Sequence, residues 1–245
     1  MSEVFALHYR GMPFISLGTA HIVALLVVLC LNLGLIGFRR ASADTRSIVR
    51  WMLAITLWAA ESSWHIWNVA VGAWDVRTLL PLNLCSILIW LSPLMLVRCD
   101  YRIFEFAYFL GIGGALQYLA TPDLGPYGFP HFRFIQAFTS HGLLLTAPIY
   151  MAVVEGFRPT WASLRRVVIG ANLYMVLVFI VNLAIGSNYL MLNAKPGTPS
   201  LLDLLPAWPY YVPFMELIGL TTCLLLLLPF ILADVRSERI ARHRE

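Results

Sequence analysis

The chain has 245 residues, of which 60% are hydrophobic and 12% are charged, and its mean hydropathy is +0.76. Soluble domains are nearer 45 to 50% apolar and about 25% charged, so this composition excludes a water-soluble globular protein. The net charge is +4, but the basic residues are scattered between apolar stretches, which excludes nucleic acid as a partner.

Seven apolar stretches of about 20 residues, each bounded by charge or by Pro and Gly, follow one another along the chain. They cover residues 14–38, 48–72, 80–97, 103–120, 133–154, 167–186 and 209–233. Uninterrupted apolar runs satisfy their backbone in lipid as helices, unlike the alternating strands of a barrel. We therefore predict an all-α fold, with seven transmembrane helices in a single polytopic domain over residues 1–245.

The loops between these stretches predict an orientation. Thirteen of the 17 basic residues lie on one side, and only Arg10, Arg77, Arg133 and Lys195 lie on the other. Short cytoplasmic loops carry an excess of Lys and Arg. We therefore expect a multi-pass protein of the cell membrane with its N-terminus outside and its C-terminus in the cytoplasm.

Several ionisable or nucleophilic side chains interrupt the apolar stretches at a similar depth. At a rise of about 1.5 Å per residue from the outer end, the depths are about 8 Å for Cys85, 10 Å for His65 and Glu216, 12 Å for His141 and 16 Å for Glu61. A charge inside the bilayer costs at least about 2.5 kcal/mol and marks a functional site by default. The sequence thus predicts a site in the outer half of the bundle.

The second apolar stretch also has one unusually polar face. Its members recur at spacings of 3, 4, 3 and 4 and are Trp58, Glu61, His65, Asn68 and Gly72. We expect this face to point toward the bundle axis. A purely structural role is the alternative, in which Glu61 satisfies His65 one turn away.

Among the four cysteines, Cys85 is the candidate nucleophile. Pro81 is expected to open the third helix and to place Cys85 one turn inside its N-terminus, where the helix end favours a thiolate. The other three, Cys30, Cys99 and Cys223, fit inert small side chains in apolar runs. No cysteine pair has the spacing of a disulfide framework or zinc site.

A metal site is a second interpretation of the polar residues. Glu61 and His65 together with Asp123 and His131 could supply ligands, but no pair of them forms an established metal-ligand motif. We therefore expect neither a metal nor a cofactor.

Four segments together resemble a known family. They are PLNLC ending at Cys85, QYLATPD from Gln117 to Asp123, PHFRFIQ from Pro130 to Gln136 leading to His141, and NYLML from Asn188 through Tyr189 to Leu192, followed by Lys195 and Pro196. In this order they resemble the YwaF family of bacterial integral membrane proteins, over nearly the whole chain. That family is related to the eukaryotic transmembrane protein 164 and, more remotely, to androgen-induced hydrolases of fatty acid esters of hydroxy fatty acids.

The resemblance implies a catalytic pair. The eukaryotic relative is described as an acyltransferase that moves a fatty acyl chain onto a lysophospholipid with a membrane-embedded Cys and His, which match Cys85 and His141. The remote hydrolases use a Thr and a His in a comparable arrangement. This chain departs from many bacterial members, which carry a His where it has Asn83, so the polarising role of that position does not carry over to Asn83.

We therefore predict a membrane-embedded lipid acyltransferase or acyl-ester hydrolase that acts on a phospholipid or lysophospholipid from the outer leaflet, with Cys85 as nucleophile and His141 as general base. Supporting or substrate-binding residues are expected among Asn83, Glu61, His65, Gln117, Asp123, His131, Asn188, Tyr189 and Glu216, with Asn83, Gln117 and Asn188 as oxyanion donors. The alternative is a small-molecule or proton-coupled transporter whose path is lined by Glu61, His65 and Glu216. A retinal protein is excluded because the one lysine, Lys195, lies in a loop.

Overall fold

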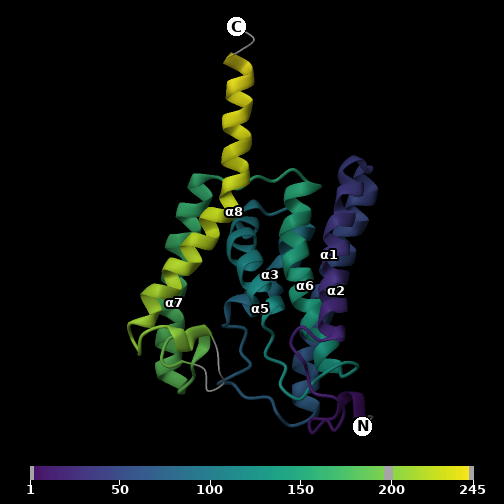
Figure 1. Ribbon diagram of the computed structural model, residues 1–245, viewed down its shortest axis with the longest axis vertical. Coiled ribbons are helices and arrows are strands. Elements are labelled where there is room, and N and C mark those ends of the chain that lie inside the picture. Colours follow the sequence, from purple (N-terminus) through teal and green to yellow (C-terminus); the bar gives the residue numbers. More distant parts are fainter. Residues whose placement is uncertain (1–2, 196–200, 243–245) are drawn as a thin grey trace. The chain divides into compact units, whose positions relative to one another are not determined.

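The computed structural model describes residues 3–195 and 201–242, and the chain forms two compact units, Met1–Phe157 and Arg158–Glu245. Within the described ranges there are helices and no strands, which confirms the all-α class. The longer helices of the first unit are α1 (Thr19–Gly34), α2 (Ala43–Ala70), α3 (Leu84–Arg98), α5 (Ile112–Ala120) and α6 (Phe132–Val153), and those of the second are α7 (Trp161–Ile185) and α8 (Tyr211–Arg242) (Figure 1). That residues 1–245 act as one domain stays a prediction.

Each predicted apolar stretch coincides with helix, although the first and the third begin about one turn later than expected. The first begins at Thr19, because Gly18 is still extended, and a 3-10 helix (Leu35–Arg40) continues it. The third begins at Leu84, after Asn83 as an extended N-cap residue, so Pro81 lies in the preceding turn and does not open the helix. Cys85 is consequently the second residue of α3 and not one turn inside it.

The fourth stretch is three segments and not one regular helix. The short α4 (Tyr101–Phe106) is capped by Asp100, whose Oδ1 accepts hydrogen bonds from the amides of Arg102 and Ile103. A π-helical turn (Ala107–Gly111) then leads into α5. Such turns shift the register of a helix and are frequent at functional sites.

The core of the first unit forms where α2, α3 and α6 pack against one another, with α5 and α1 also against α6. Fully buried side chains there include Leu57 on α2, Met95 on α3 and Leu144 on α6. At one end, Arg50 of α2 donates to Glu155 after α6 at 2.5 Å, and Tyr150 donates to the Arg46 carbonyl at 3.0 Å. These contacts fix α2 against α6.

In the second unit, α7 begins with a capping box between Thr160 and Ser163 and ends at Gly186, whose φ of 67° is left-handed. After α7 the chain makes a 3-10 turn (Tyr189–Met191) that packs back on the helix, with Tyr189 buried. The Asn182 amide holds this turn through both the N–H and the carbonyl of Tyr189.

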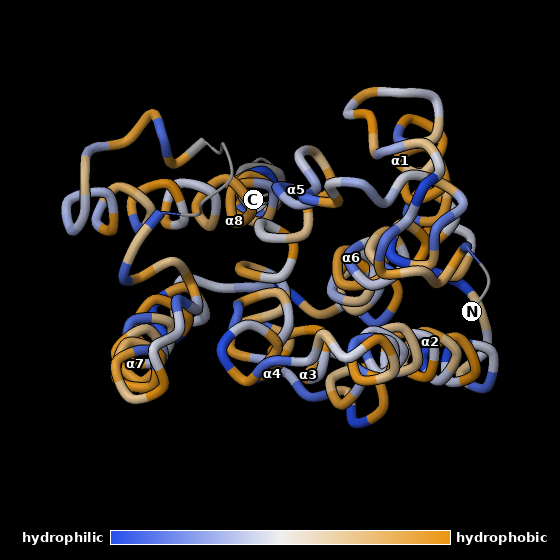
Figure 2. Tube along the Cα trace, turned by 90° about the horizontal axis from the view of Figure 1, so that it is seen from below, coloured by the Kyte–Doolittle hydropathy of each residue, from blue (hydrophilic) through white to orange (hydrophobic). Residues whose placement is uncertain are grey.

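Helices of two kinds are present. Over the described ranges, four helical stretches are long and apolar enough to cross a membrane: Thr19–Arg40, Tyr101–Ala120, Trp161–Ile185 and Tyr211–Ser237. Hydrophobic residues dominate α7 in Figure 2. The remaining three fall outside this set, since α3 has only 15 residues and α2 and α6 carry polar and charged side chains. A count of seven membrane spans therefore stays a prediction.

Candidate functional site

The Cys85 side chain lies at the N-terminal end of α3 and faces α5. The first α-helical hydrogen bond of α3 runs from the Ile87 amide to the Asn83 carbonyl at 3.0 Å, so the amides of Cys85 and Ser86 precede it. A Cβ placed on Gly114 of α5 would lie 2.9 Å from the Cys85 Sγ. The absence of a side chain at Gly114 therefore leaves room for the thiol beside α5.

One turn further along α5, Tyr118 covers the ring of His141. The two rings stack with centroids 3.5 Å apart and planes 9° from parallel. Tyr118 is also within electrostatic range of Cys85, as is Glu61 of α2. Gly114 and Tyr118 lie one turn apart on α5, so Cys85 and His141 each contact the same short face of that helix.

The hydrogen bonds of His141 identify the nitrogen that can act as a base. Its Nδ1 lies 3.0 Å from the carbonyl oxygen of Ala137 and 3.3 Å from Oγ of Ser140. A carbonyl only accepts, so Nδ1 carries the hydrogen in that bond and Nε2 carries the lone pair of the neutral ring. The ring is held in place by this bond and by the Tyr118 stack.

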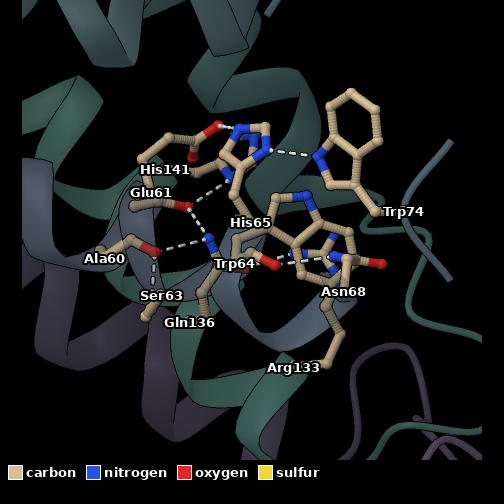
Figure 3. Close-up of polar contacts among 11 residues, drawn as sticks. Ala60, Glu61, Ser63, Trp64, His65, Asn68, Trp74, Arg133, Gln136 and His141 are labelled. Atoms are coloured by element: carbon tan, nitrogen blue, oxygen red, sulfur yellow. Dashed lines mark hydrogen bonds and ion pairs between the residues drawn. The ribbon is translucent and has the colours of Figure 1, made fainter. Parts of the chain in front are cut away.

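A chain of polar contacts runs along α6 toward His141 (Figure 3). The Nη1 of Arg133 donates to Oε1 of Gln136 at 2.5 Å, and Nε2 of Gln136 donates to Oγ of Ser140 at 3.4 Å. The same Nε2 donates to the Ala60 carbonyl of α2 at 3.3 Å. The chain therefore ties α6 to α2 beside the buried imidazole.

On the predicted polar face of α2, Glu61 and Asn68 are buried, whereas Gly72 lies beyond the helix end at Ala70 and is exposed. Glu61 is 4% exposed, and its Oε1 lies 3.8 Å from Nε2 of His65. The indole N–H of Trp74 donates to Nδ1 of His65 at 3.3 Å, so the His65 hydrogen is on the nitrogen that faces Glu61 (Figure 3). Trp58 donates to the Trp90 carbonyl of α3 at 3.3 Å.

His131 and Asp123 take places that the sequence did not predict. His131 caps α6, since its Nδ1 accepts from the Arg133 amide at 3.0 Å, and its Nε2 then donates to the Ala6 carbonyl at 3.1 Å. Burial lowers the pKa of His131 below its usual value. Asp123 is exposed. His131 therefore anchors the N-terminal segment, and its part in a site with Cys85 stays a prediction.

The three predicted oxyanion donors, Asn83, Gln117 and Asn188, each have a different local environment. Gln117 is exposed, and its carbonyl accepts from Thr121. Asn83 is the N-cap residue of α3, although its side chain does not make the capping bond. Asn188 closes its own loop, with its amide donating to the Ala194 carbonyl at 2.8 Å.

Three predicted site residues belong to the second unit. Asn188 and Tyr189 organise the turn after α7, and Glu216 has an exposed side chain on α8. Their participation in a site with Cys85 stays a prediction.

Four residues of the cluster were missed by the sequence analysis: Gly114 as a contact of the thiol, Tyr118, Arg133 and Ser140. A signal for part of this set was present, since Arg133, Gln136 and Ser140 recur at spacings of 3 and 4 on one helical face. The loop charges place Arg133 among the basic residues of the outer side, with no role in the site. Tyr118 lies in the QYLATPD segment that carries the resemblance, but nothing in the sequence indicates that its ring stacks on His141.

In the described part of the chain, no three His, Cys, Asp or Glu side chains gather as a metal site would require.

A sequence model of the TMEM164 family matches residues 16–227. The chain belongs to the TMEM164 family. The match confirms the relation predicted from the four segments and identifies a membrane protein, while the narrower YwaF assignment stays a prediction. Searches of curated proteins and of solved structures gave no match.

Proposed function

We propose that this TMEM164-family protein is a lipid acyltransferase or acyl-ester hydrolase in which Cys85 is the nucleophile and His141 the general base. The observation that supports this most directly is the shared face of α5, where Gly114 meets the thiol and Tyr118 stacks on the imidazole. Geometry comes before pKa in identifying a base, and the contacts of Cys85 and of His141 with neighbouring turns of α5 support the pair. The resemblance described above implies the same pair.

The first half of the reaction transfers the acyl group to sulfur. Nε2 of His141 takes the proton of the Cys85 thiol, directly or through one water, and the thiolate attacks the ester carbonyl of the lipid. The imidazolium then gives that proton to the departing alkoxide, and the acyl group remains on Cys85 as a thioester. Hydrogen bonding of Nδ1 to the Ala137 carbonyl keeps Nε2 available for both steps.

The developing oxyanion needs donors close to the sulfur. The amides of Cys85 and Ser86 are suitably placed, because they precede the first helical hydrogen bond of α3. They take the role that the sequence analysis gave to Asn83, Gln117 and Asn188. In the second half, His141 removes a proton from an acceptor hydroxyl or from water, and the oxygen attacks the thioester carbonyl. The C–S bond breaks to release the acylated acceptor or the free fatty acid, and the departing thiolate takes the proton back from the imidazolium.

The orientation and the lipid source are part of the proposal. The N-terminus lies outside, seven helices cross the cell membrane, and the substrate is a phospholipid or lysophospholipid of the outer leaflet. Single cysteines near Asp123 should then react with an impermeant reagent on intact cells, and cysteines near Arg40 only after lysis. The reverse labelling would contradict this orientation.

Transport is the second candidate, because Glu61 is a buried carboxylate beside His65. In that case Cys85 is dispensable. Replacement of Glu61 by Gln would abolish substrate flux in proteoliposomes, whereas an acyl-transfer enzyme catalyses no flux.

Variants of the pair test the proposed function. Cys85→Ala should abolish acyl transfer from a labelled phospholipid in nanodiscs, and His141→Ala should lower the rate by about 10²- to 10⁴-fold. Groups that act as a unit are not additive, so the double variant should be little worse than Cys85→Ala. Cys223→Ala, a change at a buried cysteine of the second unit, is the matched control and should retain activity. Full activity of Cys85→Ala would reject the proposal.

A further inference from the structure

Arg133 is a half-buried cation with neutral partners. Its guanidinium carbon lies 4.0 Å from the centroid of the Trp64 ring, its Nη1 donates to Gln136, and its Nη2 lies 3.3 Å from the Tyr118 hydroxyl. Within the described ranges no carboxylate comes within 4.0 Å of this side chain. These hydrogen bonds use two of the five guanidinium N–H groups.

The other half-buried arginines of the first unit behave differently. Arg46 and Arg50 both reach the carboxylate of Glu155, at 3.7 and 2.5 Å. Removing a charge from water is costly unless an opposite charge compensates it. Among the described half-buried arginines of this unit, Arg133 differs because no carboxylate contacts it: its charge acts on the buried Glu61 only through space, beyond ion-pair distance.

Tyr118 links this cation to the proposed catalytic base. Its ring covers His141, while its hydroxyl reaches Arg133, so the guanidinium and the imidazole are separated by little more than one phenol side chain. The charge of Arg133 acts on both Tyr118 and His141. An anionic group bound at Arg133 would thus lie within a few bonds of an ester placed at Cys85 and His141.

We propose that Arg133 binds the phosphate of a phospholipid substrate and thereby selects phosphate-bearing acyl esters over neutral ones. This inference rests on the proposed acyl-transfer function. An acyl ester has no free carboxylate, so the anionic group that a membrane lipid presents beside its ester bonds is the phosphodiester. The planar guanidinium, stacked on Trp64 with N–H groups remaining, suits two phosphate oxygens at once.

Substrate selectivity tests the role of Arg133. Acyl release is measured in nanodiscs with dioleoylphosphatidylcholine and with dioleoylglycerol, which has the same ester bonds but no phosphate. Arg133→Gln should lower the preference for the phospholipid by about tenfold or more through its KM, as expected for loss of a charge-assisted hydrogen bond. Arg133→Lys should keep part of the preference. Arg77→Gln removes an exposed arginine and should match the wild type.

An unchanged ratio of the two substrates in a folded Arg133→Gln protein would overturn the inference. A second measurement uses Cys85→Ala protein without turnover, so it separates this inference from the proposed function. Dihexanoylphosphatidylcholine should bind more tightly than dihexanoylglycerol, and inorganic phosphate should compete weakly. Equal binding of both lipids would reject the phosphate contact, and inorganic phosphate binding as tightly as the phospholipid would reject the lipid as its source.

Discussion

The helices that carry the candidate site differ from those that are most apolar. α2, α3 and α6 pack against one another and bury Glu61, Ser92, Gln136, Ser140 and His141. By contrast, α1, α7 and α8 expose long rows of Leu, Ile and Val. Polar groups in a membrane protein are tolerated where other helices cover them, whereas an apolar surface suits lipid.

This difference explains why the three central helices are not among the four long apolar stretches, although the sequence marks each of them as an apolar run. A polar stripe lowers the apolar character of α2 and α6. The helix α3 is short because it begins only at Leu84, next to Cys85. The property that makes these helices poor matches to a simple membrane span is the one that makes them suitable for chemistry. Low hydropathy within a bundle of apolar helices is therefore a signal of function.

The largest expected effect contrasts two leucines. Leu57 on α2 is fully buried and Leu173 on α7 is 67% exposed. Leu57→Ala should lower the free energy of unfolding by about 2 to 5 kcal/mol, because it leaves a cavity. Leu173→Ala should change it by about 0.5 kcal/mol or less. Thermal unfolding in detergent measures both, and equal losses would show that α7 is packed as tightly as α2.

A smaller effect is expected at Gly114. An added Cβ would lie 2.9 Å from the Cys85 Sγ, which can yield by rotating away. Gly114→Ala should therefore leave the melting temperature nearly unchanged but slow acyl transfer by about tenfold, because the nucleophile is displaced. Gly219→Ala on α8, where a Cβ meets nothing within 4 Å, is the control. Normal activity of Gly114→Ala would mean that the thiol is not held against α5.

The smallest effect concerns His131 and pH. Burial lowers its folded-state pKa below the usual value of about 6.5, so the unfolded chain takes up the proton first as the pH falls. Stability should be complete above that value and decline as the pH falls toward the lowered pKa. The protonated ring could no longer accept from the Arg133 amide. His131→Asn should flatten the melting temperature between pH 7 and pH 5, and an unchanged slope would exclude His131 as its cause.

Sequence reasoning predicted the helices better than the site. Apolar length and the 3–4 spacing located the long helices and the inward face around Glu61, because these depend on local periodicity, but not the short 3-10 helices or the break between α4 and α5. It placed Cys85 and His141 at similar depths, but it could not show that Gly114 and Tyr118 lie between them, since contacts between helices depend on packing. Gln117 was expected in the site and is exposed, because α5 turns Gly114 and Tyr118 toward α3 and α6.

The central claim is that Cys85 carries the acyl group during turnover. Protein in nanodiscs with a phospholipid labelled in its acyl chain is quenched in acid at short times, digested and examined by mass spectrometry. The account predicts a labelled acyl thioester on the peptide that contains Cys85, lost on treatment with hydroxylamine and absent from Cys85→Ala protein. Product formed at the normal rate without acyl-Cys85, and equally well by Cys85→Ala protein, would contradict it.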